Sequence, residues 1–255
     1  MNGKALHLLH TVPDARLLAA WVARHHAHHG WQSSDLGDAF HGLLCAAFGD
    51  AAPQPFRYLG EGQGLLAYTP LDADAVRAQV ALADPLVTQT LGLGATDQHN
   101  GYQLRPFPMR WPEGHVLGFD VRVRPTVRTA KGERDVFLAA VEQANGSALQ
   151  RQAIYAQWLR DHLTLGDGAD RRDWKGAVEL LEDVHLAGFR RTQVVRRTQR
   201  RDDEARRSHV VDGPDAVLKG HLRVVNPDAF ASLLARGVGR HRAFGFGMLL
   251  LSRAA

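Results

Sequence analysis

Residues 216–251 read AVLKGHLRVVNPDAFASLLARGVGRHRAFGFGMLLL, and this stretch gives the strongest indication of the fold. It predicts a strand over 216–225, a helix that begins at Asn226-Pro227-Asp228 and runs through Leu234, and an apolar strand over 246–251. Proline is well tolerated in the first turn of a helix, which supports that start. Strand, helix and strand in this order form half of a β-α-β-β-α-β unit.

The segments before this stretch predict the rest of that unit and an earlier copy of it. We expect an α+β protein with two tandem ferredoxin-like (RRM-like) β-α-β-β-α-β domains. The glycine-rich segment 92–101 (GLGATDQHNG) is the expected linker, which gives domains over 1–95 and 102–255. The expected strands lie at 5–12, 56–59, 64–68, 87–93 and 115–124, and the expected helices at 36–48, 72–83 and 149–163.

Composition excludes several classes of protein. The chain has 255 residues, 45% of them apolar, and a formal net charge of +4. A single cysteine, Cys45, excludes an internal disulfide and a zinc site built from cysteines. No run approaches the roughly 18 apolar residues that span a bilayer. We therefore expect a cytoplasmic protein that makes no membrane contact.

Four glycines between the last helix and the last strand form a distinctive turn, Gly237-Val-Gly-Arg-His-Arg-Ala-Phe-Gly-Phe-Gly247. Exposed amides in such a turn can hold phosphate oxygens, with help from Arg240 and Arg242. Alternatively, the glycines only turn the chain and permit tight packing. The turn is neither a Walker loop nor a dinucleotide fingerprint, because it precedes a strand and lacks Gly-Lys-Ser/Thr.

With this glycine spacing the sequence resembles the CasE family, the repeat endoribonucleases of type I-E CRISPR systems. The resemblance extends to 116–126 (VLGFDVRVRPT), 182–185 and 218–251, and in the N-terminal half to Asp35-Leu36 and to His41–Phe48. It implies metal-independent cleavage of the CRISPR repeat hairpin in precursor crRNA, without a cofactor. Attack by the RNA's own 2′-OH would give a 2′,3′-cyclic phosphate and a 5′-hydroxyl. The resemblance also implies that the enzyme stays bound to the mature crRNA among other Cascade-type subunits.

His41 is the candidate catalytic residue. It lies at the border of the apolar face of the predicted 36–48 helix, where a histidine reaches both core and solvent. By position alone it is a boundary residue, but the family's catalytic histidine lies on the first helix, and His41 matches it. Asp38 stands where family members often carry tyrosine; it would orient His41 and raise its pKa, or repel the phosphate. The second proton-transfer group stays open among His10, Asp38 and His241.

The histidine cluster His25-His26-Ala-His28-His29 has metal-ligand spacing but no carboxylate or cysteine to complete a catalytic set. We expect it to be a solvated face that binds nickel adventitiously, and no functional metal site.

Arginines form two basic segments. The first, 189–207 (FRRTQVVRRTQRRDDEARR), predicts a loop or ribbon along an RNA stem, or alternatively a solvated arm. The second, formed by Arg122, Arg124, Arg128 and Lys131, lies on and after the 115–124 strand. It predicts a positively charged sheet surface, or simply the wet side of a half-buried strand. The predicted RNA-binding residues are Arg122, Arg124, Arg128, Arg190, Arg191, Arg196, Arg197, Arg200, Arg201, Gly237, Gly239, Arg240, His241, Arg242, Gly245 and Gly247.

Two other functions remain open. A catalytically inactive or very slow subunit that binds the crRNA hairpin would explain Asp38 in place of tyrosine. A generic nucleotide- or phosphate-binding protein would use the glycine turn but leave the arginine-rich segment unexplained. Cleavage that persists in chelator separates the enzyme from both alternatives.

Overall fold

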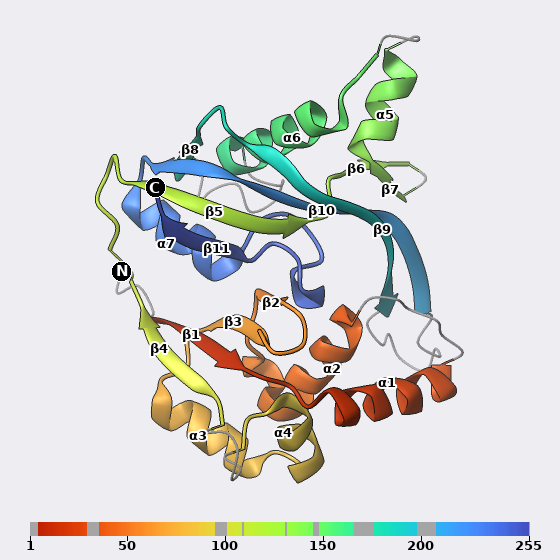
Figure 1. Cartoon of the computed structure of the whole chain (residues 1–255), viewed down its shortest axis with the longest axis vertical. Coiled ribbons are helices and arrows are strands. Elements are labelled where there is room, and N and C mark those ends of the chain that lie inside the picture. Colours follow the sequence, from red (N-terminus) through yellow and green to blue (C-terminus); the bar gives the residue numbers. More distant parts are fainter. Residues whose placement is uncertain are drawn as a thin grey trace.

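The computed structural model describes residues 5–29, 36–94, 101–108, 110–130, 132–144, 148–165, 176–197 and 208–254. Figure 1 shows two units of helices and sheet, stacked along the long axis of the molecule. None of the helices in these described ranges is both long and apolar enough to span a membrane.

The N-terminal unit occupies the lower part of Figure 1. Its elements are β1 (Leu6–Thr11), α1 (Ala15–His29), α2 (Gly37–Phe48), the 3₁₀ turn η1 (Gly49–Ala51), β2 (Phe56–Tyr58), β3 (Leu65–Thr69), α3 (Ala73–Leu82), α4 (Pro85–Leu91) and β4 (Gln103–Phe107). The sheet has the order β2-β3-β1-β4, and all its pairs are antiparallel. This is the strand order of a ferredoxin-like domain, as predicted.

The predicted strand over 87–93 is wrong, because this segment belongs to α4. The Asp84 side chain accepts a hydrogen bond from the Leu86 amide at 2.7 Å, and Pro85 occupies the first turn. Gly92 then ends the helix with a left-handed φ of 67°. Cap, proline and glycine are ordinary helix signals, and here they outweigh the apolar run that suggested a strand.

The strand that closes the first sheet is β4, which pairs with β1 from Leu6 opposite Phe107 to His10 opposite Gln103. Residues 103–107 therefore belong to the N-terminal sheet, although the sequence analysis assigned them to the second domain. We propose that the division between the two domains lies after Phe107, not in 92–101.

The C-terminal unit carries the longer strands. Its elements are β5 (Val116–Val123), β6 (Thr126–Thr129), β7 (Gly132–Asp135), α5 (Val136–Gln143), α6 (Arg151–Leu165), β8 (Val178–Leu180), β9 (His185–Arg197), β10 (Ser208–Val224), α7 (Pro227–Arg236), the 3₁₀ turn η2 (Arg242–Phe244) and β11 (Leu249–Arg253).

The sheet of this unit has the order β11-β5-β10-β8, and β9 also pairs with β10. Helix α7 begins as predicted, with the Asn226 side chain accepting from the Ala229 amide at 3.0 Å. β9 and β10 form the ribbon that the arginine-rich segment suggested, and this ribbon reaches down beside the N-terminal unit (Figure 1). The α+β fold with two ferredoxin-like domains is thus confirmed.

The two units share a core. Tyr68 of β3 is 1% exposed, and its hydroxyl donates to the Leu249 carbonyl of β11 at 2.8 Å. Leu6 and Tyr68 belong to the same buried cluster as Phe119 and Leu249 of the second unit. Helix α2 contacts both η2 and β9. The first unit's helix with His41 is therefore held against two elements of the second unit.

Candidate functional site

His41 lies on α2 at the seam between the two units. The helix buries Phe40, Leu43 and Leu44, and His41 flanks this apolar face, as its border position predicted. The imidazole contacts the Phe244 ring of η2 edge-on, with 5.3 Å between ring centroids. The contact fixes the orientation of His41 relative to the glycine turn.

The neighbours of His41 on its own helix are a thiol and a carboxylate. Cys45 Sγ lies 3.6 Å from His41 Nδ1. Burial, and then the nearby Asp50 carboxylate, raise the pKa of the Cys45 thiol, so Cys45 stays neutral at physiological pH. Asp38 lies in the first turn of α2, where a carboxylate interacts favourably with the helix dipole. Its predicted effect on His41 stays a prediction.

The four glycines of the turn are buried, and all of them have positive φ. At Gly247, an added Cβ would lie 2.2 Å from the Val238 carbonyl oxygen; at Gly237, it would lie 2.8 Å from the Gly247 oxygen. The Val238 amide donates to Gly247, and the Gly247 amide donates to the Arg122 carbonyl. The Gly237 amide donates to the Leu233 carbonyl. Because the turn is closed on itself in this way, the prediction of exposed amides is wrong at Gly237 and Gly247, and packing explains these glycines.

Two side chains of the turn, those of Arg240 and His241, are held by Glu133, a residue of β7 that the sequence analysis missed. Arg240 Nη1 donates to Glu133 Oε1 at 3.1 Å, and His241 Nε2 lies 2.7 Å from Glu133 Oε2. The His241 side chain is only 2% exposed, so it is poorly placed for the predicted contact with RNA. Arg240 remains 42% exposed and keeps its guanidinium at the surface. Glu133 is 108 positions from His241 in the sequence, so no local sequence pattern could predict that the two residues pair.

An arginine–aspartate cluster lies beside the turn. Arg122 of β5 donates through Nε and Nη2 to the two oxygens of Asp215, at 2.8 and 2.7 Å. Arg190 of β9 donates through Nε to Asp215 Oδ2 at 2.7 Å. The Phe246 ring packs under the Arg122 guanidinium, 4.2 Å from its centroid. Sequence analysis predicted both arginines but missed Asp215, because only the pairing of β5, β9 and β10 brings the three together.

Asp215 is charged despite being 3% exposed. Burial by itself would raise the pKa of its carboxyl, but the hydrogen bonds and charges of Arg122 and then Arg190 outweigh burial and lower that pKa. One carboxylate is thus shared by two guanidinium groups, which leaves an excess positive charge next to the glycine turn.

Arg124 is placed differently from its prediction. Its residue is 1% exposed, and its Nη2 donates to the carbonyls of Thr192 and Val211 at 3.3 and 3.1 Å. The prediction that Arg124 belongs to an exposed positive sheet surface is wrong, as is the alternative of a wet strand face. The β9–β10 ribbon and Phe246 cover this side chain, so it cannot contact RNA in this structure.

Another pair crosses the seam and was also missed. Arg57 of β2 lies 3.4 Å from Asp120 of β5, which Lys219 also approaches to 3.1 Å. Burial lowers the pKa of Arg57 despite the opposing effect of Asp120, and the neighbouring Arg122 lowers it further. Positive side chains from both units therefore converge on the same part of the seam.

The remaining arginines lie on the ribbon and the β6–β7 hairpin. Arg191 is 58% exposed and contacts Asp212 at 2.5 Å, and Arg128 of β6 is exposed. Arg196 and Arg197 end β9, but their side chains, like those of the 25–29 histidine cluster, lie outside the described residues. Arg200 and Arg201 lie outside them entirely. Whether these arginines bind RNA stays a prediction, and the same holds for Arg242 of η2.

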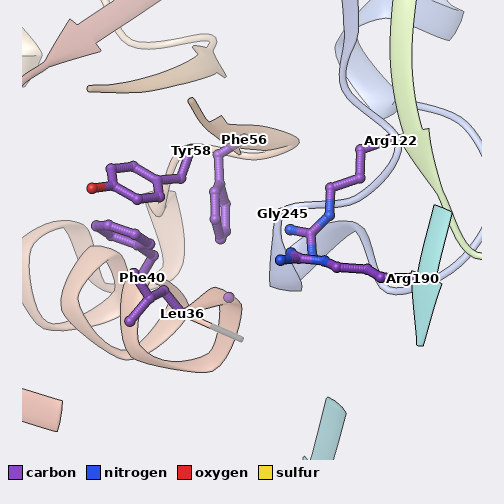
Figure 2. Close-up of a pocket in the computed structure, with 8 residues that line it drawn as sticks. Leu36, Phe40, Phe56, Tyr58, Arg122, Arg190 and Gly245 are labelled. Atoms are coloured by element: carbon purple, nitrogen blue, oxygen red, sulfur yellow. The ribbon is translucent and has the colours of Figure 1, made fainter. Parts of the chain in front are cut away.

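A pocket of about 180 Å³ opens at the seam, and its lining includes Phe40, the residue before His41 on α2. Figure 2 shows Leu36, Phe40, Phe56 and Tyr58 on one side and the guanidinium groups of Arg122 and Arg190 on the other, near Gly245. The site thus combines an imidazole that can transfer a proton, an adjacent apolar and aromatic wall, and cations that can hold a phosphate.

Comparisons with known proteins identify the family and support the fold. The family model described as "CRISPR associated protein" matches residues 13–253. No curated protein matches the chain significantly. Among solved structures, CRISPR endoribonuclease Cse3 bound to 19 nt RNA is 20% identical with a TM-score of 0.56, covering 97% of this chain and 99% of that one.

Two further structures are similar over nearly the whole chain. Thermus thermophilus Cse3 bound to an RNA representing a pre-cleavage complex has 20% identity and a TM-score of 0.55, covering 97% and 99% of the two chains. A chain of a CRISPR RNA-guided surveillance complex, pre-nicking, has 17% identity and a TM-score of 0.52, covering 97% and 100%. These likenesses support the fold.

Proposed function

The chain belongs to the CRISPR-associated protein family, and from this we propose that it is a metal-independent endoribonuclease that cleaves CRISPR repeat hairpins in precursor crRNA. The observation that carries the proposal is the position of His41, which lies at the seam against Phe244. Gly245, the next residue of the turn, lies near Arg122 of the arginine–aspartate cluster, because a Cβ added there would be 3.7 Å from Arg122 Nη1. Similarity to Cse3 structures with bound RNA supports it.

The proposed reaction is a transesterification on one RNA strand. Its requirements are a base for the 2′-OH, an acid for the leaving 5′-oxygen, and positive charge near the phosphorane. His41 supplies one proton transfer, and the excess guanidinium charge around Asp215 stabilises the phosphorane. The products are a 2′,3′-cyclic phosphate and a 5′-hydroxyl.

After cleavage the protein stays bound to the hairpin of the mature crRNA and takes part in a Cascade-type complex. Similarity to a chain of a surveillance complex supports this part of the proposal. The exposed arginines of the β9–β10 ribbon, Arg190 and Arg191, provide charge for the phosphates of the stem.

A single-turnover assay on the host's repeat RNA in excess EDTA tests the activity. We expect wild type to cut and His41→Ala to be slower by about 10²–10⁴-fold, with hairpin affinity retained. His115→Ala is the matched control, because His115 is an exposed histidine outside the site. Mass spectrometry of the product ends checks for the cyclic phosphate.

The rival function is a subunit that binds the crRNA hairpin without cutting it, and Asp38 in place of the family's tyrosine favours it. Tight hairpin binding with no cleavage by wild type or His41→Ala would establish the rival. Cleavage that disappears in EDTA would contradict the metal-independent mechanism.

A further inference from the structure

The pocket at the seam has two walls of different chemistry, and each comes from a different unit (Figure 2). Its apolar wall comes from α2 and β2 of the first unit. Its cationic wall comes from β5, β9 and the glycine turn of the second unit. Such a combination fits a ligand with a flat apolar part and an anionic part.

The apolar wall is an aromatic cluster. The rings of Phe40 and Tyr58 lie 4.7 Å apart between centroids, and those of Phe40 and Phe56 lie 6.4 Å apart. Phe40 and Phe56 are buried, whereas Tyr58 and Leu36 are partly exposed at the pocket. Tyr58 is therefore the accessible ring of this cluster, supported from behind by Phe40, and an accessible aromatic ring is the usual stacking surface for an unpaired nucleobase.

The cationic wall is held in place before any ligand binds. Both Nε and Nη2 of Arg122 are fixed by Asp215, and Phe246 supports its guanidinium plane. Arg190 uses Nε for Asp215, its side chain is 61% exposed, and its Nη groups meet no protein acceptor within the described ranges. Those donors are therefore available to a phosphate oxygen.

The pocket is also next to the proposed reaction centre. His41 follows Phe40 in α2, and its ring contacts Phe244, which precedes Gly245 of the pocket. A base inside an intact stem has both faces covered by its neighbours and cannot enter a side pocket. An unpaired nucleotide at the foot of the stem can enter.

We propose that this pocket is a subsite for one unpaired nucleotide adjacent to the cleaved phosphodiester, with its base on the aromatic wall and its phosphate on Arg190. The subsite rests on the proposed function, because it requires a hairpin RNA in the seam. With this subsite, recognition of the RNA depends on the fit of the nucleotide that flanks the stem as well as on the stem itself.

Equilibrium binding to three versions of the host's repeat RNA tests the subsite. They are the stem-loop alone, the stem-loop with unpaired flanking nucleotides, and the same RNA with abasic flanking positions. In each RNA the nucleotide on the 5′ side of the scissile phosphate carries a 2′-deoxy sugar, so the attacking 2′-OH is missing and no cutting occurs. For wild type we expect the intact flanks to bind at least about fivefold more tightly than the abasic ones.

Variants separate the two walls. Tyr58→Ala is expected to bring the intact and abasic RNAs to the same affinity, and Arg190→Ala to remove most of the gain that flanks give over the stem-loop alone. Arg191→Ala is the matched control: Arg191 is the next residue on β9, has similar exposure, and pairs with Asp212. It should lower the affinity for all three RNAs by the same factor. Circular dichroism checks that each variant is folded.

Equal affinity of wild type for intact and abasic flanks would overturn the subsite, while cleavage of the hairpin would leave the proposed function standing. An effect of Tyr58→Ala on the stem-loop alone, equal to its effect on the flanked RNA, would overturn it as well. Failure to bind any of the three RNAs would overturn the proposed function together with the subsite.

Discussion

Arginines on β5 and β9 flank the same strand, β10, yet they have different environments. Arg122 and Arg124 of β5 are 8% and 1% exposed as residues, whereas the side chains of Arg190 and Arg191 of β9 are 61% and 58% exposed. Phe246 and the ribbon cover the first pair. The second pair lies on the ribbon itself, with its guanidinium groups reaching solvent.

The difference shows that an arginine on a strand acquires its role from the layer that covers its face. Arg124 satisfies carbonyls in the interior, and Arg122 and Asp215 form a buried ion pair that shapes the site. Arg190 has features of both the buried and the exposed arginines, because it pairs with the buried Asp215 while its Nη groups reach solvent. The buried pair therefore positions the exposed charge.

The largest expected effect is on stability. Arg122→Ala leaves the Asp215 carboxylate buried with one partner, and we expect the free energy of unfolding to fall by about 3–5 kcal/mol. Arg190→Ala removes an exposed partner and should cost less than about 1 kcal/mol. Urea denaturation of both variants measures the difference. Equal losses would contradict the distinction between buried and exposed arginines.

Acid should weaken the same pair. The pKa of Asp215 is lower in the folded protein than in the unfolded chain, so its stabilisation is complete above the unfolded pKa of about 4 and is lost as the pH falls through the lower folded value. Asp215→Asn cannot titrate, so its stability deficit relative to wild type should shrink below about pH 4. Denaturation midpoints at pH 6 and pH 3 test this, and a deficit that grows in acid would contradict it.

Arg190 and Arg191, the exposed arginines, should contribute to the salt dependence of RNA affinity. Each phosphate contact that is lost reduces the slope of log affinity against log salt concentration by about 0.9. We expect Arg190→Ala and Arg191→Ala each to reduce this slope by about 0.9 or less. A fluorescence titration with the repeat hairpin at several salt concentrations measures the slope. Arg77→Ala is the control, because Arg77 is exposed on α3 of the first unit. A slope unchanged in both ribbon variants would remove the ribbon from the RNA interface.

The smallest effect is expected when the buried pair is replaced as a whole. In Arg122→Met with Asp215→Leu, no buried charge is left alone, so the free energy of unfolding should stay within about 1 kcal/mol of wild type. Urea denaturation and a thermodynamic cycle with the single variants measure this. A loss as large as that of Arg122→Ala would show that the hydrogen bonds, not the isolated charge, hold this region together.

Local signals predicted much of the fold. Asn226 and Pro227 mark the start of α7, and the apolar spacing of 36–48 predicted α2 with His41 at the border of its buried face. The same kind of signal was overlooked at Asp84, Pro85 and Gly92, where it outweighed the apolar run and made a helix. These elements depend on neighbours in the sequence, so the sequence alone can specify them.

The sequence by itself thus determined the two ferredoxin-like units, most of their strands and helices, and the helix that carries His41. Only the tertiary structure decided that Arg124 is buried, that Glu133 holds His241, and that Asp215 is shared by two arginines. Periodicity states which residues share a face of a strand, because the backbone repeats locally. It contains no information on what covers that face, since the covering residues come from distant segments brought together by folding.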